Sequence, residues 1–270
     1  MKKDSEEKKL FFAFDIEANW LKYPIEKKMI DEKSRHLTLL FLGFINFQNI
    51  KTYLIDLPKL DLKIGAVGYF DKLLFLPQNH PRVLSFDVEF LEKKEKIYEF
   101  QKQLVSFFKE RNFEINQKES FLPHVTICRD SFNSKNWKEN FQRSSLYIKG
   151  FCLYESIENS IYNILWKKDF LDPFEEIKHT ADIAFIVRGE NFLDLLIHSF
   201  SAISFKDPKL INYIHLLKNP NSIDDVIINL NEIVTQAEID GENISFKAIS
   251  FHADIVKKDE ILYWEMIVDV

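Results

Sequence analysis

Two histidine–threonine pairs are the residues of this sequence best suited to chemistry. His36 and Thr38 stand two positions apart, and the same spacing returns in His124 and Thr126. Histidine titrates near pH 6.5, about where a side chain can both take and give a proton in neutral solution. A threonine hydroxyl can donate a hydrogen bond to an oxygen on which charge builds up. Hydrolysis of a cyclic phosphodiester needs these groups, because a base must activate water and an acid must protonate the departing oxygen.

Each pair lies in a short apolar segment that is typical of a strand. The first runs over 35–43 and ends in a glycine, and the second runs over 123–129. Residues two apart on a strand point to the same face, so each histidine projects beside its threonine. Either pair alone is also what a half-buried strand would contain. Two copies favour a site, and its chemistry requires no metal.

The remaining pattern predicts the elements that must position these pairs. The strongest helix signal is at 92–111, where apolar residues recur on one side. A strand, a helix and further strands occur twice, each time around one pair, so two similar lobes would face each other across a cleft. This predicts an α+β unit with two antiparallel sheets. We expect strands at 10–16, 62–70, 72–76, 83–88, 147–154 and 161–167, further helices at 24–33 and 49–57, and a loop at 130–140.

Charge divides the chain in two. Residues 1–172 contain 28 Lys and Arg against 25 Asp and Glu, whereas residues 173–270 contain 8 against 17. Pro173 follows the last expected strand of the first part, so we predict two domains, 1–172 and 173–270. The first could accept an RNA phosphate, but the acidic second is a poor candidate for direct nucleic-acid binding.

Cysteine usage indicates a reducing compartment, and hydropathy indicates a chain without a signal peptide or membrane span. The two cysteines, Cys128 and Cys152, have neither a disulfide framework nor a metal-binding spacing. The charged segment 1–9 lacks the apolar core of a signal peptide. No apolar run approaches the roughly 18 residues of a membrane span. We therefore expect a soluble, cytoplasmic protein with no membrane partner.

Residues 8–170 resemble the two-histidine (2H) phosphoesterases, and specifically the LigT-like RNA 2',3'-cyclic phosphodiesterases. Besides the two pairs, the resemblance rests on 10–15, on the proline before His124, on Arg129 after it and on 153–156. It implies a bilobal α+β fold of two antiparallel sheets with helices.

The resemblance also implies a role for each site residue. His36 would be the general acid and His124 the general base, although the sequence alone does not order them. Thr38 and Thr126 would grip the phosphate, and Arg129 would bind substrate. The substrate would be an RNA end with a 2',3'-cyclic phosphate, and this domain would need no cofactor.

The second part of the chain has helix signals near 191–200 and 223–236, and it ends in an apolar strand interrupted by Asp269. An acidic residue there is either simply solvated or has a function such as binding a cation. Together with Asp182 and a main-chain or terminal oxygen of Val270, it would supply hard oxygen ligands suited to Ca²⁺ or Mg²⁺.

Three segments of this part resemble archease, the small protein that activates RNA-splicing ligases of the RtcB type. They are 179–183, 247–252 and 268–270. The resemblance implies a smaller α+β domain, a divalent cation at Asp182, Asp269 and Val270, and an RtcB-type ligase as partner. His179 and His252 would lie near that pocket. The domain is shorter than archease, so we expect a strand pair to be missing.

Together the two resemblances predict a fusion protein. The first domain would hydrolyse 2',3'-cyclic phosphate RNA ends to 2'-phosphates, and the second would assist an RtcB-type ligase in tRNA splicing or RNA repair. The first domain could instead remove ends that the ligase should not join. Two alternatives stay open: a non-catalytic adaptor that binds RNA ends and recruits the ligase, and a 2'-5' RNA ligase that uses the same four residues.

Overall fold

Strand β1 (Glu7–Ala18) is the element around which the first part of the chain is built. The computed structural model describes residues 7–115, 120–130, 132–180, 182–250 and 255–270. In it, β1 pairs with β2 (His36–Asn46) on one side and with β6 (Ser144–Ser156) on the other. The other elements are β3 (Val67–Leu76), β4 (Val83–Phe90), β5 (His124–Arg129), β7 (Tyr162–Asp169), α1 (Phe47–Lys51), α2 (Lys94–Lys109), α3 (Ser134–Asn140) and two short 3₁₀ helices, Glu32–Ser34 and Glu158–Ser160.

Among the described residues of this part, seven antiparallel strands form a single sheet in the order β1-β2-β5-β4-β3-β6-β7. Because β6 also pairs with β1, the first six strands close into a ring. The prediction of two separate sheets is therefore wrong. The reason is that β6 pairs with β3 through its first residues and with β7 through its last, while the pair Leu37–Val125 joins β2 to β5.

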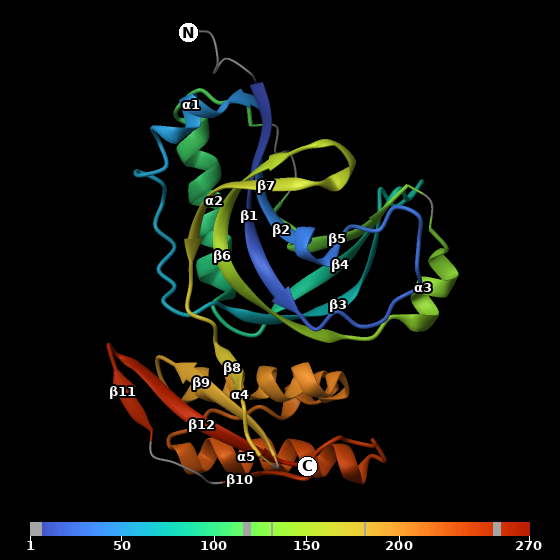
Figure 1. Ribbon diagram of the computed structural model, residues 1–270, viewed down its shortest axis with the longest axis vertical. Helices are drawn as coiled ribbons and strands as arrows, with labels where there is room; N and C mark the ends of the chain where they lie inside the picture. The colour runs from blue at the N-terminus through green and yellow to red at the C-terminus, as the bar shows by residue number, and fades with distance from the viewer. Residues whose placement is uncertain (1–6, 116–119, 131, 181, 251–254) are drawn as a thin grey trace.

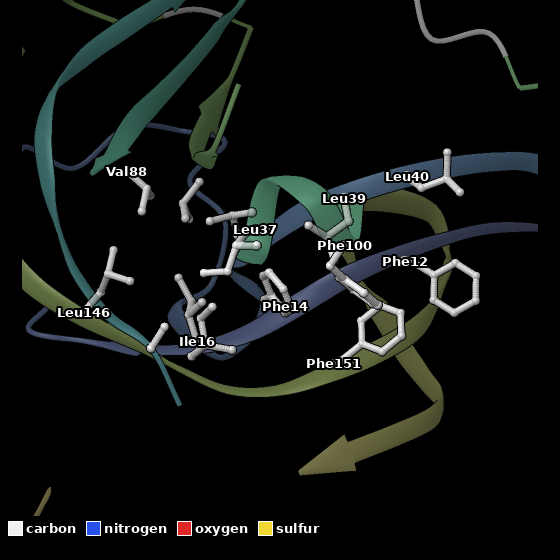
Figure 2. Packing of buried hydrophobic residues seen from close by; sticks show 14 of the residues in the cluster. Phe12, Phe14, Ile16, Leu37, Leu39, Leu40, Val88, Phe100, Leu146 and Phe151 are labelled. Carbon is white, nitrogen blue, oxygen red and sulfur yellow. The ribbon is translucent and has the colours of Figure 1, made fainter. Parts of the chain in front are cut away.

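Aromatic and aliphatic side chains fill the space between this sheet and α2. Phe12 and Phe14 of β1, Leu37 of β2, Phe100 of α2 and Phe151 of β6 are at most 3% exposed. Figure 2 shows them among the buried cluster. The apolar stripe predicted for 92–111 thus belongs to a real helix, α2, which packs its apolar side on the sheet.

The segment 24–33 is not the helix that its sequence suggested. The backbone N–H of Ile30 donates to Ile127 (2.8 Å), and the N–H of Arg129 donates to Lys28 (3.1 Å), so the segment runs alongside β5. Ile30 is buried in this position. Pairing with a distant strand has outweighed a local helix propensity, which is only a weak preference.

Residues 130–140 are not the loop that was expected, because they include α3. The Asn133 side chain accepts a backbone N–H of the first turn, as an N-cap does. Trp137 is fully buried, and its Nε1 donates to Glu26 Oε1 at 3.1 Å. The helix was missed because Trp137 is its single apolar residue.

The second part of the chain packs helices against a smaller antiparallel sheet. The described strands follow the order β10-β12-β9-β8, and β11 pairs with β12. The helices expected near 191–200 and 223–236 are confirmed as α4 and α5. The elements are β8 (Phe174–Ile177), β9 (Ile183–Gly189), α4 (Phe192–Lys206), a 3₁₀ helix (Pro208–Leu216), α5 (Ile223–Ile239), β10 (Ala248–Ser250), β11 (Val256–Lys258) and β12 (Ile261–Asp269).

Helix α4 also joins the two parts of the chain. It lies against β9 on one side and against β3 and β6 on the other (Figure 1). Val67, Tyr69 and Tyr147 of the first sheet belong to the buried cluster of the second part. Asn19 donates its side-chain amide to the backbone oxygen of Phe205 at 2.7 Å.

In the described residues, no helix is both long and apolar enough to cross a membrane.

Candidate active site

Neighbouring strands β2 and β5 position the two histidine–threonine pairs. Leu37 pairs with Val125 in an antiparallel register, and both side chains are fully buried in the core. One residue further in each direction, His36 lies opposite Thr126 and Thr38 opposite His124. Side chains alternate along a strand, so these four point to the face away from the core. The two pairs are thus related by an approximate two-fold axis.

The four side chains share one cavity of about 240 Å³. Arg129, at the end of β5, also lines it, so the structure brings together all five residues predicted for the first domain. The sequence interpretation did not assign a site role to the other residues of the wall: Lys9, Phe11, Phe41, Leu76, Val83, Ser156 and Tyr162.

The two histidines are held in the same way. His36 Nδ1 lies 2.8 Å from the Ser34 carbonyl oxygen, and His124 Nδ1 lies 2.8 Å from that of Leu122. A carbonyl oxygen only accepts, so each Nδ1 carries a proton and donates it. Each Nε2 is then the atom left to exchange a proton with a ligand.

The environment of His36 opposes its protonation. Its ring packs against Phe11 (4.8 Å between ring centroids), Tyr154 (5.3 Å) and Tyr162 (4.7 Å). This burial lowers the pKa of His36 to about 4, with smaller contributions from the charges of Arg129 and His124. The hydrogen bond to Ser34 acts in the opposite direction. His36 is therefore neutral at pH 7 in the free protein.

A buried serine orients one of the threonines. Ser85 of β4 pairs with Thr126, and its Oγ is 3.4 Å from Thr126 Oγ1. If Ser85 donates in this contact, the Thr126 hydroxyl keeps its own proton for a ligand in the cavity. No local pattern pointed to Ser85, because only the register of β4 on β5 places it there.

Two cations stand at the cavity wall. Arg129 and Lys9 are both exposed and lie on different strands, β5 and β1. Their charges suit an anionic ligand such as a phosphodiester, and the positive field of Arg129 reaches His36.

The predicted metal ligands lie together in the second part of the chain. Ile183 of β9 pairs with Val268 of β12, so Asp182 and Asp269 stand at adjacent strand ends. Ser250 Oγ donates to Asp269, 2.7 Å from either carboxylate oxygen.

The surroundings of these carboxylates are partly occupied by basic groups. His179 Nδ1 is 3.8 Å from the Asp182 carboxylate, and Lys247 Nζ donates to the backbone oxygen of Val270 at 2.9 Å. Across the described ranges, no group of three or more His, Cys, Asp or Glu side chains could hold a metal ion. His252 lies outside the described residues. Carboxylate and main-chain oxygens, as in Asp182, Asp269 and Val270, are the donors that a hard cation takes, and Lys247 competes for the Val270 oxygen.

Known proteins resemble the first part of the chain. A family model described as "AKAP7 2'5' RNA ligase-like domain" matches residues 13–177. The RNA 2',3'-cyclic phosphodiesterase of Thermotoga maritima is 26% identical over 186 residues, which are 59% of this chain and 94% of the relative. The protein of the same name from Methanocaldococcus jannaschii is 25% identical over 155 residues, 50% of this chain and 80% of the relative.

Solved structures with some likeness cover about three fifths of the chain. E. coli LigT complexed with 3'-AMP is 19% identical and covers 62% of this chain and 99% of its own, with a TM-score of 0.43. The protein TT0787 of Thermus thermophilus is 19% identical and covers 60% of this chain and 97% of its own, with a TM-score of 0.45.

Proposed function

Since the chain belongs to the AKAP7 2'5' RNA ligase-like domain family, we propose that it hydrolyses 2',3'-cyclic phosphate ends of RNA to 2'-phosphates. The observation that carries this proposal is the convergence of two histidines and two threonines on one cavity. Two relatives named RNA 2',3'-cyclic phosphodiesterase support it.

In the proposed reaction, the cyclic phosphate lies between the two histidines. One Nε2 takes a proton from water, whose oxygen forms a bond to phosphorus. The bond from phosphorus to O3' breaks, and the other Nε2 gives its proton to that oxygen. Thr38 and Thr126 donate to the non-bridging oxygens, where charge accumulates, and Arg129 attracts the phosphate.

The surroundings of His36 favour the base role in the free protein. The family resemblance gives the acid role to His36, but a pKa of about 4 leaves this residue neutral in the free protein. His36 is thus ready to act as a base, whereas it can act as an acid only once the phosphate charge favours its protonation. In both cases the reactive form has one histidine Nε2 protonated and the other Nε2 unprotonated.

The low pKa of His36 predicts an unusually acidic lower limb in the pH profile of kcat/KM. As the pH falls through about 4, His36 is protonated in the free protein and the singly protonated pair is lost, whichever role His36 has. We expect kcat/KM to fall tenfold per pH unit only below about pH 4. Circular dichroism at each pH checks that the protein stays folded. A lower limb near pH 6.5 would show that His36 is not buried as described.

The proposal is tested with a short RNA that ends in a 2',3'-cyclic phosphate, incubated with the purified chain and EDTA. We expect hydrolysis, because histidines supply both proton transfers. Binding of the RNA end without turnover would favour the adaptor, and joining of a second RNA to the end would favour the 2'-5' ligase. Either result would overturn the proposed hydrolysis.

For the second part of the chain we propose the archease-like role, namely assistance to an RtcB-type RNA ligase in tRNA splicing or RNA repair. The proximity of Asp182 to Asp269 supports it, and these two residues with Val270 would hold a Ca²⁺ or Mg²⁺ ion. Calcium should then raise the Tm of the intact chain but not that of Asp269→Asn. The proposal fails if the chain leaves ligase turnover unchanged.

A further inference from the structure

Two strongly exposed phenylalanines lie on β2, and the first of them, Phe41, lines the catalytic cavity. Phe41 is 60% exposed and Phe44 is 68% exposed, although both lie on β2. Their apolar neighbours on the same strand are buried in the core: Leu37, Leu39, Leu40 and Leu42. Large exposed aromatic side chains beside a functional cavity indicate a binding surface rather than a folding requirement.

Two irregularities of β2 turn both rings toward the cavity side. Leu39 and Leu42 have no partner in the register of β1 on β2, so each is an extra residue of a β-bulge. Each bulge shifts the alternation of side chains by one position. As a result Phe41 and Phe44 lie on the same face as Thr38, instead of pointing alternately inward and outward. Gly43, with φ of 85°, provides the left-handed backbone at the second irregularity.

The rings continue a strip that starts at the catalytic histidine. The His36 ring packs on Phe11 (4.8 Å between centroids), and Phe11 packs on Phe41 (5.6 Å). Phe41 pairs with Phe11 and Phe44 pairs with Lys9, two residues earlier on β1. Two strand residues span roughly 6.6 Å, which is comparable to one nucleotide step of an extended strand.

The charge beside the strip is positive. Lys9 lies across from Phe44, is exposed and lines the cavity. The next residue on this face of β1 is Glu7, which is also exposed and would repel a phosphate. The favourable part of the strip is therefore short. It lies along the first half of β1, at the end of the sheet away from the second part of the chain (Figure 1).

We propose that Phe41 and Phe44 stack on the bases near the RNA end and that Lys9 binds the phosphate between them. This inference rests on the proposed function of the same cavity and specifies its substrate as a single-stranded oligonucleotide end rather than a mononucleotide. Aromatic platforms flanked by cations are the usual means of holding single-stranded nucleic acid, because every base has a face that can stack. A protein partner would have less use for a cation pointing into the catalytic cavity.

The test compares adenosine 2',3'-cyclic phosphate with a tri-adenylate that ends in the same group. We expect kcat/KM of the intact chain to be about tenfold higher for the trinucleotide, the scale of one stacked base. Phe44→Ala should bring the ratio of kcat/KM for the trinucleotide to that for the mononucleotide close to one. Lys9→Ala should make this ratio less sensitive to salt. Ile239→Ala is the matched control, since Ile239 is a 72% exposed residue of α5 and should leave the ratio unchanged.

The inference is overturned if the intact chain shows a ratio of one, or if Phe44→Ala keeps the ratio of the intact chain. If neither substrate is turned over, the proposed hydrolysis fails. A binding measurement then tests whether the strip of Phe41 and Phe44 holds RNA. The Kd of a fluorescent tri-adenylate with a 3'-phosphate is then measured by anisotropy. A roughly tenfold weaker Kd for Phe44→Ala supports the strip, and an unchanged Kd rejects it.

Discussion

Alanine at His36 or at His124 is expected to lower kcat for a 2',3'-cyclic phosphate RNA end by about 10²–10⁴-fold, the range of a general acid or base. Each histidine has its Nδ1 bonded to a backbone carbonyl, so its Nε2 is the single ring atom available for proton transfer. The double variant should lose little more than either single variant, because the pair works as a unit.

His215→Ala is the matched control for these two variants. His215 is exposed in the second part of the chain, and its Nδ1 also lies near a backbone oxygen, that of Asn212 at 3.2 Å. It should keep full activity. Full activity of the His36 variant with an inactive His124 variant would reduce the mechanism to one histidine and contradict the two-histidine account.

Glu92→Leu is expected to lower the free energy of unfolding by about 3–5 kcal/mol, as breaking a buried ion pair does. Glu92 lies where β4 meets α2, and its Oε1 is 2.8 Å from Nε2 of His198 on α4. The two side chains are 7% and 0% exposed. Lys93 Nζ lies 3.2 Å from the other Glu92 oxygen and 3.9 Å from Asp194. Without Glu92, the buried Nε2 of His198 would lose its carboxylate partner, and the buried Lys93 ammonium would keep only the longer contact to Asp194.

The pKa of Glu92 agrees with this arrangement. Burial acts to raise the pKa of this carboxyl, but His198 and Lys93 together hold it below the ordinary value. The carboxylate is thus charged in the folded protein and is matched by its neighbours.

Urea unfolding followed by circular dichroism measures the effect, with Glu139→Ala as control. Glu139 forms an exposed contact with Lys135 at 3.8 Å, which should contribute less than about 1 kcal/mol. We expect the Glu92 variant to unfold at clearly lower urea, with the second part of the chain separating from the first. A loss as small as that of the control would show that the buried pair does not hold the two parts together.

Local patterns were sufficient to predict which histidines and threonines share a face, because a strand determines its own alternation. His36 and Thr38 share a face for this reason, as do His124 and Thr126, and the structure places all four on one cavity. The helix α2 was also predictable from a local pattern, because its apolar residues recur with the period of a helix.

Features that depend on pairing between distant segments could not be predicted from the sequence. The closure of the ring depends on β6 pairing with β1, and the role of Ser85 depends on the register of β4 on β5. The bulges that turn Phe41 and Phe44 outward leave no mark in a simple alternation pattern. The contact between Glu92 and His198 joins residues 106 positions apart, so no local period could indicate it.

Hydrolysis by the two histidines is tested by identifying the product with ³¹P NMR. A short RNA with a 2',3'-cyclic phosphate is incubated with the intact chain in EDTA, and with His36→Ala and His124→Ala in parallel. We expect the intact chain to replace the cyclic phosphate signal by that of a 2'-phosphomonoester, while both variants leave it in place. A cyclic phosphate that persists with the intact chain, or a 3'-phosphate product, would rule out hydrolysis to a 2'-phosphate by the two histidines.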